Sequence, residues 1–213
     1  MSTNPNKRVR AAENEGAHSK FHGEFRMAAQ SGLVTVAAAA SSTAGHMFVM
    51  RNPSTTKKFQ LRYLAATFAT TTAMAAQQPM GYDLIVGRAY TASHTGGTAI
   101  DMFTATGSNK VRTNQDLTLF TTNTVRIATT AGLTAGTHTL DGQAISQKMF
   151  LSPTLGNVAE VVLFDARDDG DGAVRSTLSL GQDEGIIVRN SVLMGATGVG
   201  YLVINVEWDE ITL

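Results

Sequence analysis

The sequence predicts an all-β fold, an antiparallel β-sandwich that is jelly-roll-like and carries an extended N-terminal arm. Three observations favour this fold. Apolar and polar residues alternate with a period of two, threonine and glycine are abundant, and patterns typical of helices are rare. The 213 residues include 28 Thr and 20 Gly. The branched Cβ of threonine suits strands, and glycine suits the turns between them.

Residues 1–26 form the first predicted unit, an extended arm that docks on a partner protein. This segment mixes basic and acidic residues without apolar periodicity, so it cannot bury a core of its own. The residues predicted to contact the partner are Lys7, Arg8, Arg10, Phe21, Phe25 and Arg26. Aromatic anchors fit a partner's pockets, and basic residues favour an acidic protein surface. The alternative is that the arm lies along its own sandwich as an additional edge strand.

Residues 27–213 form the second predicted unit, the β-sandwich domain. Phe59, Leu61 and Tyr63 alternate with polar neighbours, which is typical of a strand with one buried face. The same pattern predicts further strands at residues 33–40, 46–51, 82–86, 124–130, 158–164, 175–180, 185–194 and 201–210. The core candidates are Leu61, Leu84, Val86, Ile187, Val203 or its neighbours Ile204 and Val206, and Trp208.

The connections between these strands are rich in turn-forming residues. A Thr- and Gly-rich excursion around residues 96–146 is expected to run over the surface and to make lateral contacts. Residues 195–200 are interpreted as a hairpin loop between the strands at 185–194 and 201–210. A short helix is expected at residues 72–78, because the local sequence favours helix and Pro79 would end it.

Four carboxylates lie close together in the segment Asp165-Ala-Arg-Asp-Asp-Gly-Asp-Gly. Oxygen ligands at this density would suit Ca²⁺. The spacing differs from that of an EF-hand, because the third position from Asp165 is Arg167 and the twelfth from Asp169 is Leu180. We therefore predict a hairpin turn after the strand that ends at Phe164, with a Ca²⁺ loop as the alternative.

The five histidines form no recognisable site in the sequence. Only His18 and His22 lie close together, and their segment lacks the helical pattern and the glutamate of a His-Glu-x-x-His site. The other three, His46, His94 and His138, are expected to be packed or to face solvent. Serine and threonine occur without a nucleophile elbow or a phosphate-binding loop. The sequence thus predicts no metal, no cofactor and no catalytic residue.

Charge and composition narrow the classes of partner. Seventeen basic and seventeen acidic residues give zero net charge, which provides no general attraction to nucleic acid or to an anionic membrane. The absence of cysteine excludes disulfides and thiolate metal sites. The apolar stretches are too short to span a bilayer, and the polar start is not expected to be a signal peptide. The expected partners are therefore proteins.

Several segments resemble one group of proteins. They are Gly81-Tyr-Asp-Leu-Ile-Val-Gly-Arg-Ala-Tyr-Thr-Ala-Ser, Val125-Arg-Ile-Ala-Thr-Thr-Ala-Gly-Leu-Thr-Ala-Gly, Asp183-Glu-Gly-Ile-Ile-Val-Arg-Asn, Val192-Leu-Met-Gly-Ala-Thr-Gly and Val203-Ile-Asn-Val-Glu-Trp-Asp-Glu. Together they resemble virion structural proteins of tailed bacteriophages, over most of Gly32 to Leu213. The resemblance implies a β-sandwich on the capsid surface of a virion, a decoration or cement protein. Its implied partner is the major capsid protein or another virion protein.

Two functions are expected on these grounds. The first is non-enzymatic: a homo-oligomer, with a trimer favoured, that binds and stabilises the major capsid protein lattice. The alternative is a receptor- or glycan-binding module of a virion fibre or tail. That module would need exposed aromatic residues in a loop cleft, for which Tyr90 and Tyr201 are the candidates.

Overall fold

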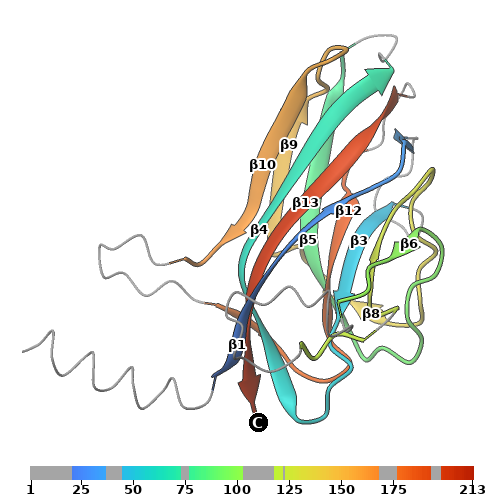
Figure 1. Ribbon diagram of the computed structural model, residues 1–213. Helices are drawn as coiled ribbons and strands as arrows, with labels where there is room; N and C mark the ends of the chain where they lie inside the picture. The colour runs from blue at the N-terminus through green and yellow to red at the C-terminus, as the bar shows by residue number, and fades with distance from the viewer. Residues whose placement is uncertain are drawn as a thin grey trace, which may run out of the picture.

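Two antiparallel β-sheets that face each other make up the molecule (Figure 1). This computed structural model describes residues 21–36, 45–72, 77–102, 118–121, 123–167, 177–192 and 198–213. Within these residues the fold is all-β, which confirms the predicted β-sandwich. The helix expected at residues 72–78 falls mainly on residues 73–76, which lie outside the described residues. Thr72 itself ends a strand, and Gln77 and Gln78 are not helical.

The first sheet is built around two long antiparallel strands. Its described strands, in spatial order, are β1 (Phe21–Gln30), β13 (Gly198–Thr212), β4 (Lys57–Thr72) and β10 (Val158–Asp165), with β2 (Val34–Val36) beside β13 and β11 (Leu178–Leu180) beside β4. Pairing of β4 with β13 extends from Val199 opposite Thr72 to Thr212 opposite Lys57. These two strands are therefore the centre of the sheet.

The second sheet consists of shorter strands. Its described strands, in spatial order, are β6 (Thr98–Ala99), β7 (Val125–Ile127), β3 (His46–Arg51), β12 (Gly185–Asn190), β5 (Pro79–Arg88) and β8 (Thr139–Leu140), with β9 (Ser146–Leu151) also beside β5. The strands predicted at 46–51, 82–86 and 185–194 are its three central members. The predicted excursion at 96–146 contributes β6, β7 and β8 to this sheet, and β9 begins at its last residue.

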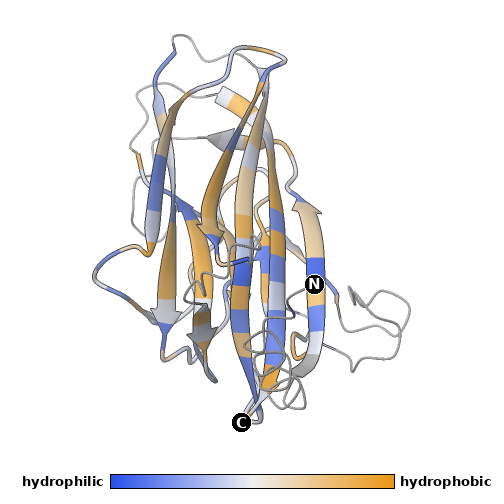
Figure 2. Cartoon of the chain, turned by 90° about the vertical axis from the view of Figure 1, so that its left-hand side faces the viewer, coloured by the Kyte–Doolittle hydropathy of each residue, from blue (hydrophilic) through white to orange (hydrophobic). Residues whose placement is uncertain are grey.

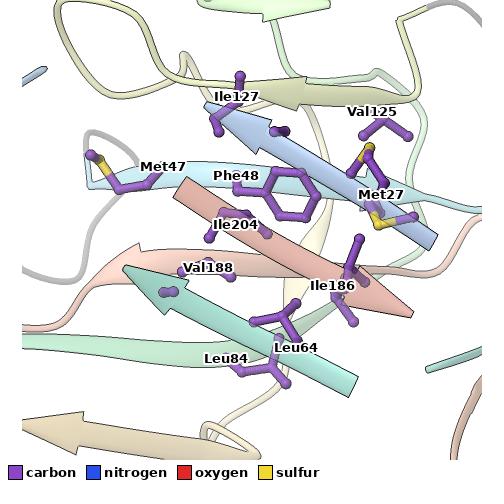
Figure 3. Packing of buried hydrophobic residues seen from close by; sticks show 14 of the residues in the cluster. Met27, Met47, Phe48, Leu64, Leu84, Val125, Ile127, Ile186, Val188 and Ile204 are labelled. Carbon is purple, nitrogen blue, oxygen red and sulfur yellow. The ribbon is translucent and has the colours of Figure 1, made fainter. Parts of the chain in front are cut away.

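The main core lies between the sheets and follows the alternation predicted for residues 201–210. Leu202, Ile204, Val206 and Trp208 are buried, whereas Val203 between them is half-buried. Figure 2 shows hydrophobic and hydrophilic bands succeeding one another along the long strands. In Figure 3, side chains from both sheets meet in this layer, among them the labelled Phe48, Leu64, Leu84, Ile186 and Ile204. The predicted core residues Leu61, Leu84 and Val86 belong to the same layer.

A second, smaller core lies on the opposite face of the second sheet. Its buried residues are Val49, Ile85, Tyr90, Leu133 and Ile187, with Leu140 packed against them. The three central strands supply Val49, Ile85 and Ile187, and the connections around β6 and β8 supply the rest. The predicted core residue Ile187 is thus buried, but beneath loops and not between the sheets.

A β-bulge changes the phase of β4. The register against β13 shifts between Leu61 and Tyr63, which leaves Arg62 as the additional residue. As a result, Leu61 and Leu64 are buried, whereas Tyr63 is half-buried. The guanidinium carbon of Arg167 lies 3.7 Å from the centroid of the Tyr63 ring. The prediction that Tyr63 shares the apolar phase of Leu61 is therefore wrong, because the bulge interrupts the period of two.

Two predicted hairpins are also contradicted. β12 and β13 belong to different sheets, so residues 195–200 do not connect hairpin strands. Residues 193–197 lie outside the described residues, and Gly198–Gly200 already pair within β13. β10 and β11 each pair antiparallel with β4, so they run in the same direction. β10 and β11 are therefore not the two strands of a hairpin, and the residues of the Asp165–Gly172 segment from 168 onward lie outside the described part of the chain.

Trp208 is the centre of an aromatic cluster in the main core. Its ring stacks on Phe25 at a centroid distance of 5.4 Å, and it is in edge-to-face orientation with Phe59 and Phe120 at centroid distances of 6.5 and 5.6 Å. Its Nε1 donates a hydrogen bond of 3.3 Å to the fully buried Glu210. The cluster thus joins β1, β4, β13 and the segment at residues 118–120.

Glu210 accepts several hydrogen bonds at the edge of this aromatic cluster. Its carboxylate accepts bonds from the Thr118 hydroxyl at 2.5 Å and from the Leu119 backbone N–H at 2.9 Å, and Lys57 Nζ lies 3.4 Å away. Burial raises the pKa of Glu210, whereas these donors and the lysine charge lower it. The hydrogen bonds from Thr118 and Leu119 to this carboxylate hold residues 118–120 over the aromatic rings.

The first prediction concerns the replacement Trp208→Ala. Removing a fully buried indole should lower the free energy of unfolding by about 3–5 kcal/mol, because the ring leaves a cavity in contact with three aromatic side chains. The measurement is urea denaturation followed by circular dichroism. Val203→Ala, on the outward phase of the same strand, is the control and should cost less than about 1.5 kcal/mol. Equal losses in both variants would contradict the described strand phase.

Candidate functional site

The predicted arm residues fall into two groups. Lys7, Arg8 and Arg10 lie outside the described residues, and their predicted role stays a prediction. The other three belong to β1, which pairs with β13 as an edge strand of the first sheet. For residues 21–26 the alternative of an additional edge strand is therefore confirmed, and the arm boundary at residue 26 is wrong.

Phe25 is a core residue and not a partner anchor. Its side chain is 1% exposed and stacks on Trp208, so no partner can reach it. Phe25, Met27 and Ala29 are buried in alternation with exposed or half-buried neighbours. This period of two is present in the sequence, but the small side chains of Ala28 and Ala29 make it hard to recognise. Phe21 pairs with Ile211 in the ladder.

Arg26 is exposed and belongs to a network of ion pairs on the outer face of the first sheet. Its Nε lies 3.6 Å from Glu207, and Arg167 approaches the same carboxylate at 3.9 Å. Arg62 lies 3.6 Å from Glu24 and 3.4 Å from an oxygen of Asp209. These side chains line a shallow groove. Because the charges pair within the chain, the groove has little charge left with which to attract a ligand.

An exposed apolar surface lies along β9 and β10, which run side by side at the upper left of Figure 1. We call this surface the β9–β10 strip. Its residues, 38% to 65% exposed, are Met149 and Leu151 on β9, Leu155 in the connection, and Val158 and Val162 on β10. Large apolar side chains that gather on one surface mark a site of protein contact more often than scattered ones do.

Sheet geometry explains why this surface is uncovered. β9 pairs with β5 in the second sheet, and β10 pairs with β4 in the first. Phe150 of β9 and Val161 of β10 pack against the main core, so their immediate neighbours along each strand point away from it. The strip also carries one exposed charge of each sign, Lys148 on β9 and Glu160 on β10. Exposed apolar side chains and charges of both signs are therefore present along these two edge strands.

Three histidines from distant parts of the sequence meet on the outer face of the second sheet. His46 begins β3, His94 follows β5 and His138 precedes β8. The register of β3 against β12 shifts between His46 and Phe48, so Met47 is the additional residue of a bulge. Met47 and Phe48 both join the main core, and the bulge turns His46 to the opposite face.

The three imidazole rings lie close together. His46 Nδ1 is 2.7 Å from His94 Nε2, and the centroid distances are 5.0 Å for His46–His94, 4.9 Å for His94–His138 and 5.9 Å for His46–His138. One candidate ligand atom from each ring lies within 4.8 Å of the other two. Tyr90 stacks on His138 at 4.5 Å. The rings therefore converge in a way that the sequence did not indicate.

The hydrogen bonding of this cluster is incomplete. His46 and His94 are 0% and 2% exposed. Among the described residues, no partner is found for His46 Nε2, His94 Nδ1 or His138 Nδ1. An unsatisfied buried polar group costs about 1–3 kcal/mol. The nitrogens that converge, His46 Nδ1 and His94 Nε2, are not among these unpartnered atoms, and it is their convergence that makes the cluster a candidate for a metal ion.

Burial keeps these histidines neutral. It lowers the pKa of His46 to about 4, with His138 and Arg189 adding to the effect, and that of His94 to about 3, with His46, His138 and Arg126 adding to it. It also lowers the pKa of His138, against a hydrogen bond with the Gly136 backbone. Neutral imidazole is the form that binds metal ions.

A search of family models, curated proteins and solved structures found no match. In the described part of the chain, no helix is long and apolar enough to cross a membrane. Function is therefore inferred from the arrangement of the chain's own residues.

The second prediction is a loss of stability on mild acidification. The folded pKa values of His46 and His94 lie below the ordinary value of 6.5, so the unfolded chain binds more protons as the pH falls. The free energy of unfolding should be constant above about pH 7 and should fall below about pH 6.5, by about 1 kcal/mol per histidine at about pH 5.5. Urea denaturation at each pH, in the presence of EDTA, measures this free energy of unfolding.

The matched variants for this test are His94→Gln and His22→Gln. The first removes one titrating member of the cluster and should reduce the loss of stability on acidification. The second changes a histidine of β1 outside the cluster and should leave that loss unaltered. If the wild type and both variants lost the same free energy of unfolding between about pH 7 and about pH 5.5, the histidine cluster would not be the source of the loss.

Proposed function

We propose that this protein is a non-enzymatic structural protein of a bacteriophage virion. It acts as a capsid decoration protein that binds the major capsid protein lattice at the capsid surface and stabilises it. The β9–β10 strip is the observation that carries the proposed assembly of copies of the chain. The resemblance to tailed-bacteriophage virion proteins supports the location. The confirmed β-sandwich is the fold that this resemblance implies.

Within this proposal the β9–β10 strip is the contact between copies of the same chain. Its apolar residues lie on edge strands of both sheets, where a second molecule can approach without disturbing the core. Lys148 on β9 and Glu160 on β10 have opposite charges, so β9 of one copy and β10 of the next can form a head-to-tail contact, the kind that closes a trimer. A homo-oligomer, with a trimer favoured, is the assembly we propose.

The N-terminal arm is the proposed contact with the capsid lattice. In this proposal the arm consists of the residues before Phe21, since β1 begins there. Lys7, Arg8 and Arg10 remain its basic residues, and an acidic surface of the major capsid protein is their proposed counterpart. Phe21, Phe25 and Arg26 belong to β1 and are not part of this arm. Phe25 is buried, and Arg26 pairs with Glu207 within the chain.

The alternative function, binding of a receptor or glycan, receives less support from the described residues. A glycan site of this kind needs exposed aromatic rings. Trp208 and Tyr90 are buried, and Tyr201 is half-buried. Half-buried Tyr63 is covered by Arg167. The described aromatic residues therefore serve packing more than recognition.

The third prediction tests the self-association surface. The double variant Met149→Ser, Leu151→Ser should weaken self-association by about tenfold or more, because central apolar anchors dominate the energy of such contacts. Size-exclusion chromatography with light scattering, over a range of protein concentrations, is the measurement. Leu33→Ser, an exposed leucine outside the strip, is the control and should assemble normally. A monomeric wild-type protein would overturn the assignment of the strip.

The fourth prediction tests the arm. Deleting residues 1–20 leaves all of β1 in place, so the melting temperature and the oligomeric state should not change. Binding to particles that lack the native protein, followed by co-sedimentation, should be lost. The triple variant Lys7→Gln, Arg8→Gln, Arg10→Gln should bind more weakly and with less sensitivity to salt. Full binding by the truncated protein would refute the role of the arm.

A further inference from the structure

We propose that His46, His94 and His138 form a binding site for one divalent transition-metal ion of the zinc type. The inference is independent of the proposed function, because it depends on the outer face of the second sheet and not on the β9–β10 strip or the arm. The site is made by one strand and two connections that are far apart in the sequence.

Geometry provides the first argument. Two nitrogens bound to one Zn²⁺ at about 2.0–2.1 Å in a tetrahedral arrangement lie about 3.3 Å apart. His46 Nδ1 and His94 Nε2 are 2.7 Å apart, and the ligand atom of the third ring is within 4.8 Å of both. Ring rotations that move these nitrogens by less than about 1 Å would therefore admit the ion.

The donor set provides the second argument. Imidazole nitrogens suit Zn²⁺ and its neighbours in the transition series, and three histidines are a known zinc-binding set. Ca²⁺ and Mg²⁺ prefer oxygen ligands, and no carboxylate belongs to this group among the described residues. The chemistry of the group thus selects a transition metal over the calcium considered for the Asp165–Gly172 segment.

The hydrogen bonding of the rings indicates which nitrogens the ion would use. Each of the three rings has one buried nitrogen for which the described residues offer no partner. In a neutral imidazole one nitrogen donates and the other holds a lone pair. His46 Nδ1 and His94 Nε2 face each other and share one hydrogen bond, so an ion between the rings would take the lone pairs of these two nitrogens in place of that bond. The unpartnered His46 Nε2 and His94 Nδ1 lie on the other side of each ring.

Two arginines near the rings, Arg189 and Arg126, do not prevent the binding of a metal ion. Arg189 raises the local potential at His46, but it donates three hydrogen bonds of 2.7 to 2.9 Å to the buried Asp83. Arg126, near His94, donates to the Gly96 carbonyl and to Asn123. The Asp83 carboxylate therefore offsets the charge of Arg189.

The bound ion would link two connections, the one that contains His94 and the one that contains His138, to the second sheet. His94 and His138 belong to the segments that cover the smaller core, and Thr95 bridges to Thr134 between them. A metal held by His46, His94 and His138 would join both segments to β3. Because it binds the folded chain and not the unfolded one, it would stabilise the fold by mass action.

The experiment uses the full chain, treated with EDTA and then dialysed. Adding Zn²⁺ should give binding of one ion per chain by isothermal titration calorimetry. At about 100 times the dissociation constant the melting temperature should rise by about 5–10 °C. Replacing Zn²⁺ by Co²⁺ should give the visible absorption of nitrogen-bound cobalt. The wild-type protein failing to bind either ion would overturn the proposal.

Two variants locate the site. His138→Gln changes the half-buried member and should keep the fold, which circular dichroism checks. Its affinity for Zn²⁺ should fall by more than about 100-fold, beyond the loss caused by an outer-shell partner. His22→Gln, outside the cluster, should bind as the wild type does. Unchanged affinity and cobalt absorption in His138→Gln would show that the ion binds elsewhere and would refute the assignment.

Discussion

The long antiparallel pairing of β4 with β13 is the interaction on which the rest of the structure depends. Among the described strands of the first sheet, β1 and β2 pair with β13, and β10 and β11 pair with β4. The inward side chains of this pair form one wall of the main core, with Leu64, Phe68, Ile204 and Trp208 among them. Burial of each large apolar side chain contributes about 1.5–3 kcal/mol, so this wall is a major source of stability.

The same pairing decides where surfaces remain uncovered. β13 is closed on its outer edge by β1, whose Phe25 completes the aromatic cluster around Trp208. β4 is closed by β10, which has no further partner among the described strands. β9 holds the corresponding position beside β5 in the second sheet. Two edge strands with apolar outward faces thus lie side by side, and this is the arrangement that a second protein molecule can use.

Bulges place the chemically notable residues. In β4 the bulge at Arg62 turns Tyr63 away from the core, where Arg167 covers it. In β3 the bulge at Met47 turns His46 toward the smaller core, where it meets the two histidines from the covering connections. One additional residue in a strand reverses the face of all that precede it. Short bulges therefore decide which polar groups are buried together.

Alternation along single strands was enough to predict the all-β class, most strand positions and the inward phase of Ile204, Val206 and Trp208, because burial of one face is a local property of a strand. The partners of each strand were not predictable in this way. Whether β12 continues into a hairpin or crosses to the other sheet depends on contacts between residues far apart in the sequence. For the same reason only the tertiary structure decided that Phe25 belongs to the core, that the apolar residues of β9 and β10 lie side by side, and that His46, His94 and His138 converge. No spacing rule connects three histidines that are separated by complete strands, since their distance is set by how the strands fold over one another.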